Sequence, residues 1–104
     1  MPERKMIIST KNLRIEAILA EGSSADTFWN SLPITGRANT WGDEIYFNVN
    51  LQMPLDENAS DIVESGDIAF WPPGNAFCIF FGRTPASLGD EVRAASAVNV
   101  LGKI

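Results

Sequence analysis

Alternation of apolar and polar residues is the clearest signal in this chain, and it predicts short β-strands. Between residues 12 and 19 an apolar side chain occupies every second position. A period of two is typical of a strand that buries one face. Residues 5–9 are expected to pair with this strand through a turn at Lys11 and Asn12.

Residues 23–32 form the one segment whose pattern predicts a helix. Ser23 or Ser24 can cap its N-terminus. Phe28 and Leu32 are four residues apart and therefore share a helical face. We expect them to hold the helix against a sheet.

Between residues 34 and 49, polar and aromatic residues alternate with smaller or apolar ones. This pattern predicts two strands separated by a turn near Gly42. Polar groups beside aromatic rings suit a small ligand or a peptide. The same alternation also fits a solvent-exposed two-stranded segment in which Arg37 pairs with Glu44. The candidate binding residues of this segment are Arg37, Asn39, Trp41, Glu44 and Tyr46.

Residues 67–81 predict a hairpin whose returning strand, 76–81, is apolar on both faces. Such a strand must be covered twice, as by a barrel interior and an outer helix. Its phenylalanines at 77, 80 and 81 are expected in the core. Trp71, beside a proline-rich type II turn, either forms the lip of a binding site or belongs to a structural hairpin. Asn75 suits a turn position with positive φ.

The number and spacing of these elements predict a mainly-β fold: a closed β-barrel with one flanking short helix. The 104 residues are expected to form a single domain, 1–104. One further polar residue, Asn99, interrupts the apolar last strand, which is expected over 96–104. It either faces the mouth of the barrel as a pocket group or bonds the backbone of a neighbouring loop.

The charge balance narrows the classes of partner. Eight basic and thirteen acidic residues give a formal net charge of −5. Nucleic acids and anionic membranes attract basic surfaces, so neither is an expected partner. The first ten residues lack the apolar run of a signal peptide, and no segment is long enough to span a membrane. A cytoplasmic location is therefore expected.

Missing residue types exclude several kinds of chemistry. The chain has no histidine, which removes Ser-His and Cys-His nucleophiles and histidine-bound metals. Its single cysteine, Cys78, is expected to be a buried, reduced thiol. The acidic residues between 56 and 67 have no calcium-loop spacing and indicate a solvated loop. We therefore expect no metal and no cofactor.

Three blocks, "NTWGDEIYF", "GDIAFWPPGNAFCIFFGRTPAS" and "SAVNVLGKI", together resemble a family of small prokaryotic cyclophilin-like proteins, most of them uncharacterised. The match covers residues 12–104, and the blocks occur in family order. The resemblance implies a cyclophilin-like β-barrel with a flanking helix. It carries no firmly attached biochemical activity.

A more distant resemblance reaches the cyclophilin prolyl isomerases. It implies that Arg37 takes the position of their catalytic arginine, which stabilises the twisted prolyl peptide. It also places Phe77, Cys78 and Ile79 near the wall of the proline pocket. The position of an active-site histidine falls on Val98, so the sequence does not predict a competent isomerase.

The function expected from the sequence is a binding module for a small molecule or an extended peptide. Arg37 would fix an acceptor group, Trp41 and Tyr46 would give apolar contact, and Asn99 would add a polar anchor. One alternative is a divergent prolyl isomerase that uses Arg37; another is a homo-oligomer subunit whose exposed aromatic residues form the interface. The complete candidate set is Arg37, Asn39, Trp41, Glu44, Tyr46, Trp71, Phe77 and Asn99.

Overall fold

A computed structural model describes residues 4–104 of the chain. Residues 1–3, part of the segment in which no signal peptide is expected, lie outside this range. The described elements are β1 (Arg4–Ser9), β2 (Arg14–Leu19), α1 (Ser23–Asn30), β3 (Asn39–Thr40), β4 (Glu44–Asn48), β5 (Ser60–Val63), β6 (Asp67–Trp71), a 3-10 turn η1 (Pro72–Gly74), β7 (Ala76–Phe80) and β8 (Val92–Lys103). The prediction of a mainly-β fold with one short helix is confirmed.

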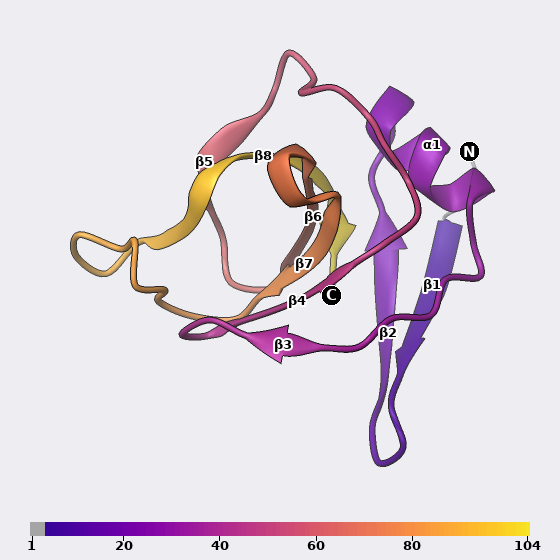
Figure 1. Ribbon diagram of the computed structural model, residues 1–104, viewed down its shortest axis with the longest axis horizontal. Helices are drawn as coiled ribbons and strands as arrows, with labels where there is room; N and C mark the ends of the chain where they lie inside the picture. Colours follow the sequence, from indigo (N-terminus) through magenta and orange to yellow (C-terminus); the bar gives the residue numbers. More distant parts are fainter. Residues whose placement is uncertain (1–3) are drawn as a thin grey trace.

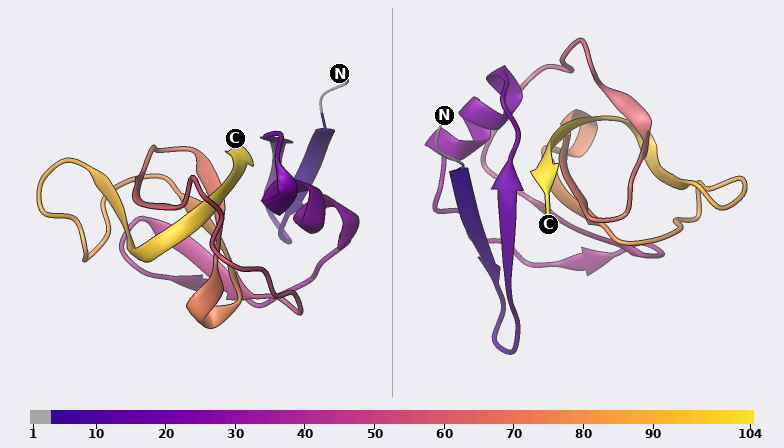
Figure 2. Two further views of the ribbon diagram at one scale, coloured as in Figure 1. Left: turned by 90° about the horizontal axis from the view of Figure 1, so that it is seen from above. Right: turned by 180° about the vertical axis from the view of Figure 1, so that it is seen from behind.

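The strands are antiparallel and form a strongly curved sheet in the order β1-β2-β8-β6-β7-β4-β3, with β5 pairing with β8. Figures 1 and 2 show β3 to β8 curling around one another, with α1 and the β1–β2 hairpin to one side. The sequence predicted a closed barrel, but the sheet is open. Among the strands of residues 4–104, no pairing joins the two ends of this path. β3 is two residues long, which is too short to carry a ladder onward.

β8 belongs to two parts of the sheet because it bends along its length. Its residues from Val92 to Val98 pair with β5, and those from Asn99 to Lys103 pair with β6 and β2. It begins at Val92, four residues before the expected start. At Gly102 the backbone of β2 approaches so closely that a Cβ atom would collide with the carbonyl oxygen of Ile18. Only glycine allows this contact.

β7 is buried along its whole length and separates two apolar clusters. Phe77 and Ile79 belong to the cluster that includes Phe28 of α1. The rings of Phe28 and Phe77 stack with centroids 4.9 Å apart. The prediction that Phe77 and Phe80 lie in the core is confirmed. Phe81 is 50% exposed and was wrongly placed there, because β7 ends one residue before it.

The segment before β4 differs most from the predicted strand. Only Asn39–Thr40 pairs with β4, and all six residues from 35 to 40 are exposed. Gly36 lies against the ring of Phe47, where a Cβ atom would collide with ring carbons. Residues 35–40 therefore have no buried face, and the segment is held against the sheet by Gly36 on Phe47 and by Ile34 at the edge of the core.

The start of α1 and the turn after Trp71 differ in part from the prediction. Gly22, with φ of 129°, occupies the N-cap of α1, and no side chain caps the helix. Ser24 instead donates its hydroxyl to the carboxylate of Asp56 at 2.8 Å. After Trp71 the chain forms the 3-10 turn η1 in place of the expected type II turn. The positive φ expected at Asn75 is confirmed, at 46°.

Asn99 is fully buried and fastens the loop that follows β4. Its side-chain oxygen accepts the amide N–H of Asp56, and its side-chain nitrogen donates to the carbonyl of Pro54, both at 2.8 Å. Of the two roles left open by the sequence, the structure shows the bond to a loop backbone. A buried amide that satisfies two backbone groups contributes to stability.

Substitution Phe28→Ala is expected to reduce the free energy of unfolding by about 3–5 kcal/mol, since it removes the ring stacked on Phe77 and leaves a cavity. The matched control Phe81→Ala, at a half-exposed ring, should cost about 1 kcal/mol or less. Urea denaturation would measure both, with Phe28→Leu as the milder variant if Phe28→Ala does not fold. Equal losses at the two positions would contradict the proposed packing.

Substitution Asn99→Leu should cost about 2–5 kcal/mol, because it leaves two backbone groups without partners. Hydrogen exchange at the Asp56 amide should also become faster than in the native protein. Asn50→Leu, at an exposed asparagine, serves as the control. Unchanged protection of the Asp56 amide in Asn99→Leu would show that the loop is held by other contacts.

Candidate functional site

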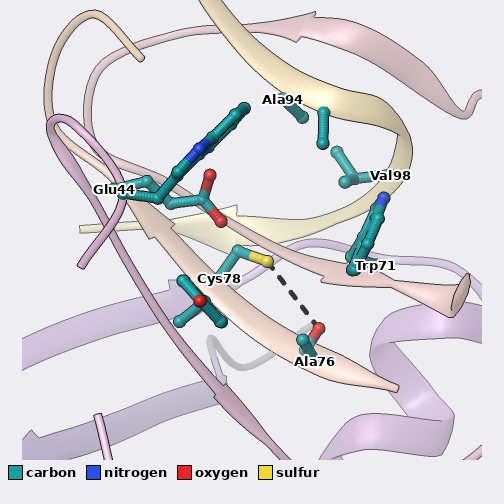
Figure 3. A pocket seen from close by; sticks show the side chains of 9 residues that line it. Glu44, Trp71, Ala76, Cys78, Ala94 and Val98 are labelled. Carbon is teal, nitrogen blue, oxygen red and sulfur yellow. Dashed lines mark hydrogen bonds between the residues drawn. The ribbon is translucent and has the colours of Figure 1, made fainter. Parts of the chain in front are cut away.

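A cavity of about 280 Å³ opens on the face of β7 that points away from α1. Three aromatic side chains contribute to its lining: Trp41 from the turn before β4, Tyr46 from β4 and Trp71 from the end of β6. In Figure 3 the carboxylate of Glu44 and the thiol of Cys78 lie close together and face the same space as Trp71. The cavity thus combines aromatic side chains with one acidic group.

Strand register explains why these side chains meet. Tyr46 lies opposite Cys78 across β4 and β7, and Trp71 lies opposite Ala76 across β6 and β7. Cross-strand partners point to the same face of a sheet. The space is left open because the remaining lining residues are small or short: Ala76, Ala94, Ala95 and Val98.

Glu44 is the acidic group of the cavity and is only 6% exposed. Its backbone exchanges hydrogen bonds with Trp41 at 2.9 and 3.2 Å, which fixes the turn between β3 and β4. Burial raises the pKa of the Glu44 carboxyl, and a hydrogen bond with Cys78 partly opposes this rise. The ion pair with Arg37 considered from the sequence is not formed.

Cys78 is a buried free thiol, as predicted. Its thiol donates to the Ala76 carbonyl oxygen, with a sulfur-to-oxygen distance of 3.8 Å, and the Glu44 carboxyl lies beside the thiol. Burial, followed by the nearby Glu44 charge, raises the pKa of this thiol well above its usual range. Cys78 is therefore a neutral wall of the cavity and not a thiolate nucleophile.

Trp71 is held in place from two sides. Its indole N–H donates to the hydroxyl of Ser96 on β8 at 2.7 Å. Its ring also lies against Gly74 of η1, where an added Cβ atom would be 2.7 Å from a ring carbon. The ring is thus positioned without help from a ligand, which favours a preformed wall.

The structure brings together four of the eight candidate residues. Trp41, Glu44, Tyr46 and Trp71 line the cavity. Arg37 and Asn39 are exposed and do not line it, because their segment lacks a buried face. Phe77 points into the cluster around Phe28, on the opposite side of β7. Asn99 is occupied by the loop that follows β4.

Five lining residues were not in the candidate set: Ala76, Cys78, Ala94, Ala95 and Val98. The isomerase resemblance had placed Cys78 near a pocket wall and Val98 at the position of a catalytic residue. Because neighbouring residues of a strand point to opposite faces, the sequence also placed Cys78 on the other face of β7 from Phe77. The alanines could not be recognised from the sequence, because their role is to leave space for the cavity and their side chains have no reactive or polar group.

A second, larger hollow of about 630 Å³ lies between the start of α1 and residues 53–58. Glu21, Asp56 and Glu57 line it, together with polar backbone at the helix start. Their carboxylates oppose the anion that a helix N-terminus would otherwise attract. Asp56 is already engaged by Ser24 and by Asn99. This hollow lacks a set of groups that converge on a ligand.

Between residues 4 and 104, no cluster of three or more histidine, cysteine, aspartate or glutamate side chains is arranged to hold a metal ion. None of the described helices is both long and apolar enough to cross a bilayer.

Comparison with known proteins confirms the family suggested by the sequence. Residues 4–104 match the family model described as Cyclophilin-like. The chain is also similar to a hypothetical protein from Archaeoglobus fulgidus whose solution structure is known, with 44% identity and a TM-score of 0.80. That match covers 98% of this chain and 79% of the archaeal one. No curated protein gives a significant match. The chain belongs to the cyclophilin-like family.

Proposed function

We propose that this protein is a binding module for a small molecule, held in the cavity between Trp41, Tyr46 and Trp71. The observation that carries the proposal is the convergence of three aromatic side chains on a space that also contains a buried carboxyl group, Glu44. Ligand sites in proteins are concave, mostly apolar and equipped with a few well-placed polar groups. This cavity has those features.

Its size sets the kind of ligand. At about 280 Å³ the cavity is close to the lower limit of about 300 Å³ for small-molecule pockets. It therefore suits a compact molecule. An extended peptide would fit only by inserting a single side chain, with the rest of its backbone on the surface.

The isomerase alternative has less geometric support. It requires Arg37 to reach a bound prolyl peptide, but Arg37 is exposed and does not line the cavity. Val98 does line it, and its side chain cannot donate a hydrogen bond. Accelerated cis–trans exchange of an Xaa-Pro peptide, lost in Arg37→Ala, would restore the alternative.

A fragment screen followed by ¹⁵N NMR tests the binding proposal directly. Ligands should shift the indole N–H signals of Trp41 and Trp71, which line the cavity. Trp29 packs beside the other apolar cluster and should not shift, so it is an internal control. Assignment requires one Trp→Phe variant for each ring. Shifts spread equally over all three indoles would contradict a specific site.

A substitution that fills the cavity should abolish these shifts. Ala95→Leu adds volume at an exposed lining position of β8, so we expect at least tenfold weaker binding with little change in stability. Ala38→Leu makes the same change at an exposed position outside the cavity. Equal binding by the two variants would place the ligand elsewhere on the protein.

A further inference from the structure

The carboxyl group of Glu44 faces the cavity without a basic partner. No lysine or arginine nitrogen within residues 4–104 lies within ion-pair distance of it. The described ion pairs engage other acidic residues: Asp26, Asp61, Glu64, Asp67 and Glu91. A carboxylate removed from water is costly unless a positive charge or hydrogen-bond donors compensate it. The thiol of Cys78 lies beside the Glu44 carboxyl, but it is a weak donor and its proton is directed at the Ala76 carbonyl oxygen.

The surrounding side chains favour a particular type of positive charge. The faces of tryptophan and tyrosine rings carry negative potential and attract cations, most strongly where water is excluded. Trp41, Tyr46 and Trp71 all line the cavity that contains Glu44. An anionic ligand would meet the Glu44 charge, and a purely apolar ligand would leave that charge uncompensated.

From this arrangement we infer that the ligand is a small organic cation of the methylated or quaternary ammonium class. Its charge would be balanced by Glu44, and its methyl groups would contact the three aromatic rings. This inference rests on the proposed binding function and specifies its ligand class.

Other cations fit less well. A calcium or magnesium ion needs about six or more oxygen ligands, whereas the lining side chains supply only the oxygens of Glu44 and Tyr46. A primary ammonium group has three N–H donors to satisfy. A quaternary ammonium group has none, so it can be enclosed by aromatic carbon and one carboxylate.

Binding of the cation should depend on whether the Glu44 carboxyl is protonated. Burial raises the pKa of the empty site's carboxyl, and a bound cation favours its charged form and would lower that pKa. Affinity for the cation should therefore increase as pH rises through the pKa of Glu44. The other titratable groups of the lining are Tyr46 on β4 and Cys78 on β7; β6 and β8 contribute none. Burial raises the pKa of the Cys78 thiol, so this group stays neutral over the pH range in which Glu44 titrates.

The test compares choline with its neutral carbon isostere, 3,3-dimethylbutan-1-ol, by ¹⁵N NMR titration of the native protein. The two probes share size and shape and differ in charge. At about pH 8 we expect choline to bind about tenfold more tightly than the isostere, with a smaller ratio at about pH 5. The signals of Trp41 and Trp71 report the cavity.

A pair of variants isolates the carboxylate. Glu44→Gln should reduce the preference for choline to about threefold or less and remove its pH dependence, because ring contacts remain while the charge is lost. Glu16→Gln, at an exposed position of β2, should keep the native preference. If Glu44→Gln does not fold, the pH dependence of the native protein still tests the inference.

The outcomes separate the two proposals. Equal binding of choline and its isostere in the cavity would overturn the cation inference and leave the binding function standing. No response to choline at millimolar concentration would also overturn the inference, while the fragment screen decides the binding function independently. A choline preference that persists in Glu44→Gln would exclude Glu44 as the balancing charge.

Discussion

Strand β7 has no solvent-exposed face, and the layers of the protein follow from that constraint. On one side its Phe77 ring stacks on Phe28, so α1 and the β1–β2 hairpin must cover it. On the other side Cys78 and Phe80 are covered by side chains of β8, among them Val92 and Val98. A strand buried twice needs two apolar layers.

The two layers differ in packing, and this difference creates the site. Large rings fill the layer beneath α1. The opposite layer has alanines on β6, β7 and β8, so the aromatic side chains of Trp41, Tyr46 and Trp71 border empty volume. An apolar cavity of this kind forgoes packing energy. The buried carboxyl of Glu44 adds a desolvation cost, and such costs are typical of sites that bind.

How much the sequence could predict depended on whether a pattern was local. The continuous apolar runs of β6 and β7 are local signals, so the bounds of β6 and the burial of Phe77 and Phe80 were predicted correctly. Alternation also grouped Trp41 with Arg37, but it cannot say which face of a strand is buried. That choice depends on the register between strands, which left Arg37 exposed and directed Asn99 to the loop. The prediction of a closed barrel failed for the same reason: whether the end strands pair depends on residues far apart in the sequence, which a local pattern does not report.

The division of β8 between two parts of the sheet has a consequence for synthesis. β8 comes after every other described element, yet it pairs with β2, β5 and β6. On the ribosome these three strands must therefore wait with unpaired edges, which are sites for aggregation. The cavity cannot exist earlier either, since Ala94, Ala95 and Val98 of β8 form part of its lining. Completion of this fold therefore waits until β8 has been synthesised, because the strands that pair with it all precede it in the chain.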